Sequence, residues 1–138
     1  MLITRRAEFS ASHVCRSPAL SPLENESVYG PEDNPRGHGH NFVLEVTLEG
    51  APDPATGMVY DLKKLKETLQ REVVDVFDHR FLNLEVAPFD RVVPTPENLA
   101  ADIWRRLEAS LREPGVRLHS VRLHETEDLW VEYRGAAT

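Results

Sequence analysis

Residues 37–50 read GHGHNFVLEVTLEG, and this stretch decides the fold. Its apolar side chains recur at every second position, which is the period of a β-strand that buries one face. Val43 interrupts the otherwise polar opposite face. The buried face is predicted to comprise His38, His40, Phe42, Leu44, Val46 and Leu48. Two histidines therefore stand at the end of an apolar face, where burial would cost free energy unless their rings were bound.

Two further strand regions are predicted on either side of this one. Near the N-terminus, Phe9 and Ala11 continue an alternation that begins at Ile3, as in a half-buried strand. The last thirty residues predict a hairpin whose turn is Glu127-Asp128. Its first strand carries Val121, Leu123 and Glu125 on one face, and its return strand carries Leu129, Val131 and Tyr133.

Two amphipathic helices are predicted between these strands. Asp61 can cap the first helix, and Thr95 followed by Pro96 is typical of the start of the second. Apolar residues recur at steps of three and four in both helices. The stripes comprise Leu62, Leu65, Leu69, Val73, Val76 and Phe77 in the first helix, and Leu99, Ile103, Leu107 and Leu111 in the second.

Two segments are predicted to lack regular structure. Residues 17–39 read as a long polar loop with four prolines, and a loop of that length in a small domain is usually functional or disordered. Residues 82–93 predict an extended connection between the helices. The expected fold is a single antiparallel α+β domain of two layers over residues 1–138.

Composition limits the classes of function. The chain has 138 residues, with 16 basic and 23 acidic side chains and a net charge of −7, which argues against a general nucleic-acid surface. No apolar run approaches the ~18 residues of a membrane span, and the N-terminus lacks the apolar segment of a signal peptide. A single cysteine rules out an internal disulfide, so we expect a cytoplasmic protein without nucleic-acid or membrane partners.

Three histidines are predicted to converge at one edge of the sheet. His38 and His40 are two residues apart on one strand, so their rings point the same way, and His13 ends the apolar face of the first strand. Pairing of these two strands would bring the three imidazoles together. Three neutral imidazoles suit Zn²⁺, which in catalytic sites takes three protein ligands and keeps a fourth position open. A His-x-His motif alone is more often a polar strand start, but these positions favour a metal site.

Five short motifs occur in an order and spacing that resemble one family. The residues that carry the resemblance are Phe9-Ser-Ala-Ser-His13, Gly37-His-Gly-His-Asn41-Phe42, Asp53-Pro-Ala-Thr-Gly57-Met58, Asp78-His79 and His124-Glu125-Thr126. Over residues 5–135 the chain resembles the 6-pyruvoyl-tetrahydropterin synthase and 6-carboxytetrahydropterin synthase family. The resemblance implies a tunnelling fold, in which two helices cover one face of a four-stranded antiparallel sheet. It further implies a homohexamer of two stacked trimeric barrels, and 7,8-dihydroneopterin triphosphate as substrate.

The resemblance also implies roles for individual residues. His13, His38 and His40 would be the zinc ligands, Glu125 the pterin anchor, and Asp78 with His79 a proton-handling pair. One carboxylate can accept both the exocyclic amine and the adjacent ring N–H of a pterin, and a helix C-terminus favours an imidazolium. Thr95 could reach the pterin edge, although its helix cap already explains it. Arg16 and Arg36 flank the histidine motifs and are candidates to meet the triphosphate.

One departure from the family pattern concerns the general base. The family usually has a cysteine six or four residues before the first histidine of His-Gly-His, whereas this chain has Glu32 and Asn34 there. A carboxylate is a weaker base than a thiolate, with a pKa near ~4.3 against ~8.5. Similar members with glutamate in this place cleave the substrate side chain between C1′ and C2′ to give 6-hydroxymethyl-dihydropterin. Glu32 therefore favours this reaction.

Several alternatives stay open. The product could instead be a 6-carboxy- or 6-pyruvoyl-tetrahydropterin, or the chain could be a zinc- and pterin-binding paralogue without activity. An interaction domain with a structural metal is less favoured, because a closed structural site needs a fourth ligand and none is obvious. Cys15 could be a surrogate base, a fourth ligand or a packing residue, and the packing role is favoured.

Overall fold

The structure is a computed structural model and describes residues 1–136. A single sheet of five strands runs in the order β3-β1-β2-β4-β5. Neighbouring strands are antiparallel except for β3, which pairs with β1 in parallel. The strands are β1 (Leu2–His13), β2 (His38–Gly50), β3 (Arg80–Phe81), β4 (Val116–Thr126) and β5 (Leu129–Tyr133). The α+β class is confirmed, and the predicted four strands form the antiparallel part of the sheet.

The count of four strands is wrong because of β3, which has two residues. The segment reaches the sheet because the backbone N–H of His79 donates to the carbonyl of Ser10 on β1, at 2.6 Å. A strand of two residues is too short to show any hydrophobic period in a sequence.

The register of β1 and β2 sets the histidines side by side. Phe9 lies opposite Phe42, and Ala11, two residues later in β1, lies opposite His40, two residues earlier in β2. His13 and His38 form the last pair of the ladder. Because side chains alternate between faces, His13, His40 and Phe42 project to the same side of the sheet.

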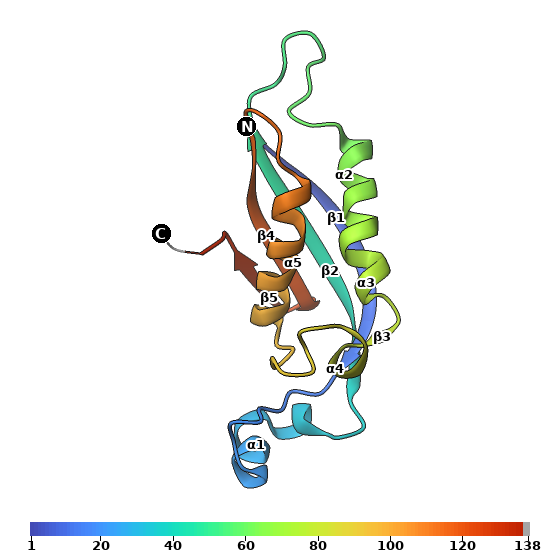
Figure 1. Cartoon of the computed structure of the whole chain (residues 1–138), viewed down its shortest axis with the longest axis vertical. Coiled ribbons are helices and arrows are strands. Elements are labelled where there is room, and N and C mark those ends of the chain that lie inside the picture. The colour runs from blue at the N-terminus through green and yellow to red at the C-terminus, as the bar shows by residue number, and fades with distance from the viewer. Residues whose placement is uncertain (137–138) are drawn as a thin grey trace.

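The helices cover this same side of the sheet (Figure 1). The first predicted helix is a continuous coil of α2 (Leu62–Leu69), a wider π turn η2 (Gln70–Val74) and α3 (Asp75–Phe77), and the second is α5 (Pro96–Ser110). Leu62, the first residue of the predicted apolar stripe, is 48% exposed in the first turn of α2. The core between the layers includes Phe42, Leu44, Leu48, Leu65, Leu69, Phe77, Leu99, Ile103 and Leu107, all fully buried.

Both segments predicted to be irregular contain helical turns. Residues 17–39 hold α1 (Pro22–Tyr29) and the 3₁₀ turn η1 (Gly30–Asp33), and α1 projects beyond the end of the sheet (Figure 1). Ser21 and Glu24 form a reciprocal capping box at the start of α1. Residues 82–93 are not extended, because α4 (Leu82–Glu85) and the following turns fold inward to bury Leu82 and Phe89. None of the helices within residues 1–136 has the length and apolar character needed to cross a membrane.

Candidate metal centre and active site

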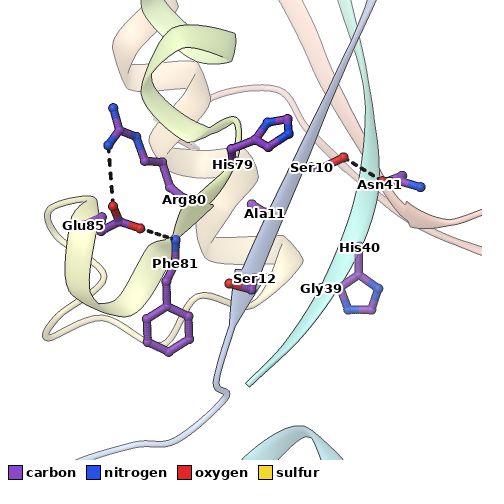
Figure 2. A pocket seen from close by; sticks show the side chains of 10 residues that line it. All are labelled: Ser10, Ala11, Ser12, Gly39, His40, Asn41, His79, Arg80, Phe81 and Glu85. Carbon is purple, nitrogen blue, oxygen red and sulfur yellow. Dashed lines mark hydrogen bonds and ion pairs between the residues drawn. The ribbon is translucent and has the colours of Figure 1, made fainter. Parts of the chain in front are cut away.

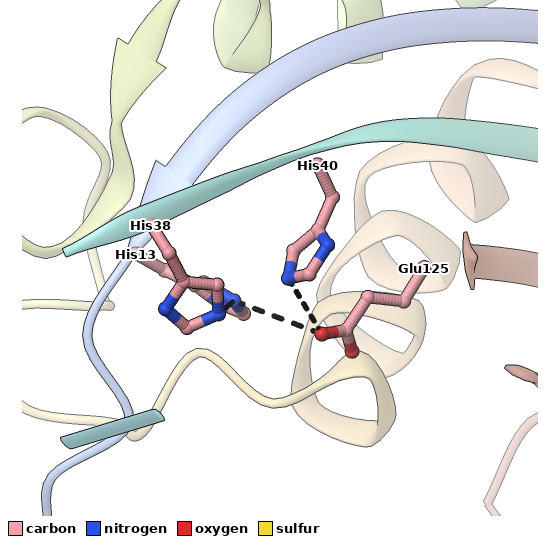
Figure 3. Close-up of side chains that lie close together, drawn as sticks. All are labelled: His13, His38, His40 and Glu125. Atoms are coloured by element: carbon pink, nitrogen blue, oxygen red, sulfur yellow. Dashed lines mark hydrogen bonds and ion pairs between the residues drawn. The ribbon is translucent and has the colours of Figure 1, made fainter. Parts of the chain in front are cut away.

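Four side chains meet at one end of the sheet (Figure 3). His13 comes from β1, His38 and His40 from β2, and Glu125 from β4. One nitrogen or oxygen atom from each lies within 4.8 Å of the others. We call these four residues the histidine–glutamate group. The convergence of the three imidazoles is as the sequence predicts.

A backbone carbonyl group holds the orientation of the His13 ring. Its Nδ1 lies 2.7 Å from the carbonyl oxygen of Pro94, which can only accept a hydrogen bond. Nδ1 therefore carries the proton, and the lone pair of Nε2 points into the group. A second hydrogen bond of this kind is what usually orients a metal-binding histidine. No sequence pattern indicates Pro94 for this role.

The inward nitrogens suit a shared cation. His13 Nε2 and His38 Nε2 are 3.0 Å apart, and on a tetrahedral ion with Zn–N bonds of about 2.0–2.1 Å they would be roughly 3.3 Å apart. His40 Nε2 is buried, and among residues 1–136 it finds no partner for a well-formed hydrogen bond, although Glu125 Oε1 is 2.7 Å away. A buried nitrogen of this kind is costly unless something binds it. The donor set fits a divalent metal ion.

Burial changes the proton affinity of the group. It lowers the pKa of His13 and His40, which keeps both imidazoles neutral, as metal ligands must be. Burial also raises the pKa of Glu125 to about 7, and the nearby carboxylates of Glu32 and Glu97 add to this. A cation bound between these side chains would favour the ionised form of Glu125.

Glu125, the predicted pterin anchor, lies beside the histidines. It is 5% exposed, and its Oε1 is also 3.9 Å from His13 Nε2. The sequence places Glu125 on the buried face of its strand, but its distance from the histidines depends on the pairing of β4 with β2, where Val43 lies opposite His124. A cavity of about 730 Å³ borders His40 and Glu125 on one side.

Glu32 approaches the group from η1. Its Oε2 lies 3.5 Å from His38 Nε2, and its side chain is 45% exposed. Cys15 Sγ lies 3.7 Å from the same carboxylate oxygen. Burial, with Glu32 adding, raises the pKa of Cys15 to about 12, so the thiol stays protonated and is a poor base. Asn34 occupies the other position at which the family often has a cysteine, and its side chain accepts a hydrogen bond from the backbone N–H of Arg36.

Asp78 and His79 pair with each other at the outer edge of β1. Asp78 Oδ2 is 2.8 Å from His79 Nδ1, and Oδ1 accepts the backbone N–H of Ser10 at 2.8 Å. These two contacts, the Ser10 bond first, lower the pKa of Asp78. The exposed His79 ring borders a cavity of about 500 Å³ together with Arg80 and Glu85 (Figure 2). Within residues 1–136, no hydrogen bond or ion pair joins His79 to the histidine–glutamate group.

The three other predicted substrate contacts lie in different settings. Thr95 caps α5 by accepting the backbone N–H of Asn98, and it follows Pro94, which holds His13. Arg16 makes a two-pronged ion pair with Asp33, with its Nε 2.6 Å from Oδ1. Arg36 is exposed, close in sequence to His38. The structure thus brings Glu32 and Glu125 to the histidines. Asp78 and His79 make no bond to that group within residues 1–136, although His79 and His40 line the same cavity (Figure 2).

The fold and this group define an α+β domain with a candidate metal centre at the end of its sheet. A family model described as 6-pyruvoyl tetrahydropterin synthase matches residues 2–136. The chain therefore belongs to the 6-pyruvoyl tetrahydropterin synthase family, and it is an enzyme of the pterin-synthase type.

Similar proteins agree with this assignment. A relative from Poecilia reticulata, named 6-pyruvoyl tetrahydrobiopterin synthase, is 44% identical over 133 residues, covering 96% of this chain and 89% of the relative. The solved 6-pyruvoyl tetrahydropterin synthase of Caenorhabditis elegans superposes with a TM-score of 0.94 at 39% identity, covering 99% of this chain and 96% of that one. A Pyrococcus furiosus relative, named dihydroneopterin monophosphate aldolase, is 34% identical over 94% of each chain. The fold is thus the tunnelling fold of these synthases.

Proposed function

We propose that this protein is a zinc-dependent lyase that cleaves the side chain of 7,8-dihydroneopterin triphosphate between C1′ and C2′, giving 6-hydroxymethyl-dihydropterin. The observation that carries the proposal is the carboxylate of Glu32, 3.5 Å from His38 at the rim of the histidine–glutamate group. The name of the Pyrococcus relative, an aldolase, supports cleavage of a carbon–carbon bond.

His13, His38 and His40 would hold the zinc ion, since their inward nitrogens lie together and two of the rings are kept neutral by burial. Bound zinc would supply a Lewis acid that polarises the hydroxyls of the substrate side chain. The backbone carbonyl of Pro94 keeps His13 in the tautomer that such binding needs.

Glu32 is the general base of the proposed reaction. Its carboxylate takes the proton of the C2′ hydroxyl, the C2′ carbonyl forms, and the C1′–C2′ bond breaks. The electron pair passes to C1′ and into the pterin ring, and a proton is then added at C1′. The triphosphate leaves on the two-carbon aldehyde. A half-exposed carboxylate beside the metal ligands is placed to reach a substrate hydroxyl.

The remaining residues bind substrate or move the second proton. Glu125 accepts the pterin N–H groups from the cavity that it shares with His40, a space of ordinary size for a small ligand. Arg36 meets the triphosphate. Asp78 and His79, at the outer edge of β1, serve an active site shared with a neighbouring copy of the chain and protonate C1′.

The test is to incubate the purified protein with zinc and 7,8-dihydroneopterin triphosphate and to identify the products by mass spectrometry. We expect 6-hydroxymethyl-dihydropterin and a two-carbon aldehyde that carries the triphosphate. Glu32→Gln should abolish turnover without loss of zinc, because Glu32 is not among the proposed ligands. If the Glu32→Gln variant still turns over the substrate, Glu32 is not the general base.

The alternative product is a 6-pyruvoyl-tetrahydropterin, which the names of relatives at 41–44% identity favour. Formation of the 6-pyruvoyl product releases free triphosphate, whereas the proposed cleavage releases a two-carbon aldehyde that carries the triphosphate. The identity of the phosphate-bearing product therefore distinguishes the two reactions. Glu32→Cys, which introduces the residue usual in the family, should shift the product distribution. Tight pterin binding without turnover in the unsubstituted protein would instead indicate an inactive paralogue.

A further inference from the structure

Three consecutive residues after β1 are each bonded to the loop that carries Glu32. The backbone N–H of Cys15 donates to the carbonyl of Glu32 at 2.9 Å. The guanidinium of Arg16 pairs with the carboxylate of Asp33. The backbone N–H of Ser17 donates to the side chain of Asn25 in α1, at 2.8 Å. Cys15 and Arg16 are neighbours in the chain, and so are their partners, Glu32 and Asp33.

We name Cys15, Arg16, Glu32 and Asp33 the clasp. The Arg16–Asp33 contact is its strongest side-chain link, because two nitrogens of a planar guanidinium meet both carboxylate oxygens, at 2.6 and 3.2 Å. The Asp33 side chain is 8% exposed, which shields this end of the pair from solvent. The Cys15 thiol adds a weaker bond to Glu32 Oε2, at 3.7 Å.

The clasp matters because, within residues 1–136, the helical turns of the segment that carries Glu32 pack little against the rest of the protein. α1 and η1 pack mainly against each other rather than against the sheet or the other helices. They lie beyond the end of the sheet, joined to it by the two chain segments that follow β1 and precede β2 (Figure 1). The Glu32 carboxylate stays near His38 only if other contacts hold this segment in position. Proton transfer requires this, because it tolerates little displacement of the base from the substrate.

We propose that the clasp positions Glu32 for the reaction, and that Arg16 is a positioning residue rather than a contact for the triphosphate. This inference rests on the proposed function, in which Glu32 is the base. The guanidinium that the sequence assigns to the triphosphate already donates to both carboxylate oxygens of Asp33, through Nε and one terminal nitrogen. Arg36 remains the arginine for the triphosphate.

The chain carries its own probe of the clasp, since Cys15 is its only cysteine and is 3% exposed. N-ethylmaleimide labelling of the zinc-loaded protein, followed by intact-mass spectrometry, measures how often the clasp opens. Arg16→Ala and Asp33→Ala should each raise the labelling rate by about tenfold or more. The exchange Arg16→Asp with Asp33→Arg restores opposite charges and should bring the rate back towards that of the unsubstituted protein. Arg36→Ala is the matched control and should leave the labelling rate unchanged.

Steady-state kinetics then separate positioning from substrate binding. If Arg16 positions Glu32, Arg16→Ala lowers kcat by about tenfold or more with little change in KM, and the charge exchange recovers part of kcat. Zinc content and far-ultraviolet circular dichroism should stay unchanged in these variants. A raised KM at constant kcat that the exchange cannot restore would overturn the inference and assign Arg16 to the triphosphate.

The two hypotheses fail in different ways. If the unsubstituted protein does not turn over the triphosphate substrate, the proposed function fails, and the labelling rates still decide whether the clasp holds the loop. If turnover occurs but Arg16→Ala changes neither labelling nor kcat, the clasp is overturned while the proposed function stands.

Discussion

At the scale of single residues, Glu125 would decide whether a metal ion bound by the three histidines keeps an open coordination position. It lies 2.7 Å from His40, close enough to be a fourth ligand, yet the family resemblance makes it the pterin anchor. We expect Glu125→Gln to retain zinc and to raise KM by about tenfold or more, because an amide cannot accept two pterin N–H groups as a carboxylate does. Zinc per chain and KM should be measured beside His40→Ala, which should lose zinc. Loss of zinc in Glu125→Gln would instead make this carboxylate a ligand.

Glu125 should also make the stability of the metal-free protein depend on pH. Burial raises its pKa from 4.5 to about 7, so between these values the folded chain binds a proton that the unfolded chain has released. The contribution of Glu125 to the free energy of unfolding is therefore greatest below pH 4.5 and is lost as pH rises through about 7.

The measurement compares the unsubstituted protein with Glu125→Gln in a metal chelator between pH 5 and 8. The unsubstituted protein should lose stability relative to the variant as pH rises. Both proteins carry His13 and His40, whose lowered pKa values act in the opposite direction and cancel in the comparison. A difference that stays flat across this range would show that Glu125 is not desolvated in solution.

The sequence predicts the relative positions of the three histidines better than it predicts which other side chains lie near them. The positions of His13, His38 and His40 follow from strand alternation, which fixes the face of each ring. The distance from Glu125 to His40 depends on how β4 pairs with β2, and that ladder contains an irregularity between Thr47 and Leu48 that no local pattern shows. The packing role favoured for Cys15 agrees with its burial, but its contact with Glu32 crosses a long loop.

At the scale of elements, the residues that precede α5 adjoin the candidate metal centre, because Pro94 accepts from His13 and Thr95 caps the helix. Thr95→Ala removes the cap on the backbone N–H of Asn98 and should lower the free energy of unfolding by about 1 kcal/mol. Thr95→Ser keeps the hydroxyl and should stay near the unsubstituted protein. Chemical denaturation measures both, and equal stability of all three proteins would contradict the capping role.

The elements that could be predicted are those with a sustained period. β2 and α5 bury one face along their whole length, so their patterns are clear. α1 has eight residues and buries only Asn25, so its one readable signal is the pairing of Ser21 with Glu24. The turns around α4 form because Leu82, Val86 and Phe89 reach the core, a tertiary contact that overrides weak local preference.

At the scale of the whole molecule, the sheet formed by residues 1–136 of one chain is open at both edges. β5 has a neighbour on one side, and β3 covers β1 only at Ala11 and Ser12. Unpaired strand edges can pair with strands of another chain. The trimeric barrels implied by the family resemblance would supply such strands. We therefore expect native mass spectrometry to give a mass six times that of the 15.7 kDa chain.

A variant of the β5 edge tests this assembly. Trp130 is 49% exposed on β5, so Trp130→Lys should shift the protein to smaller species by placing a charge at the interface. Leu62→Lys is the matched control, because Leu62 is equally exposed but lies on α2 in the helical layer. A monomer in the unsubstituted protein, or an unchanged hexamer in Trp130→Lys, would count against pairing through this edge.

The projection of α1 and η1 beyond the sheet separates two kinds of evolutionary change. The proposed metal ligands lie on β1 and β2, whose alternation is fixed by the core, so their positions tolerate little variation. In the proposed function, Glu32 selects which bond breaks, and it lies on this peripheral segment, whose helical turns pack mainly against each other. Under that proposal, changes confined to this segment could alter the product while the three proposed histidine ligands are kept.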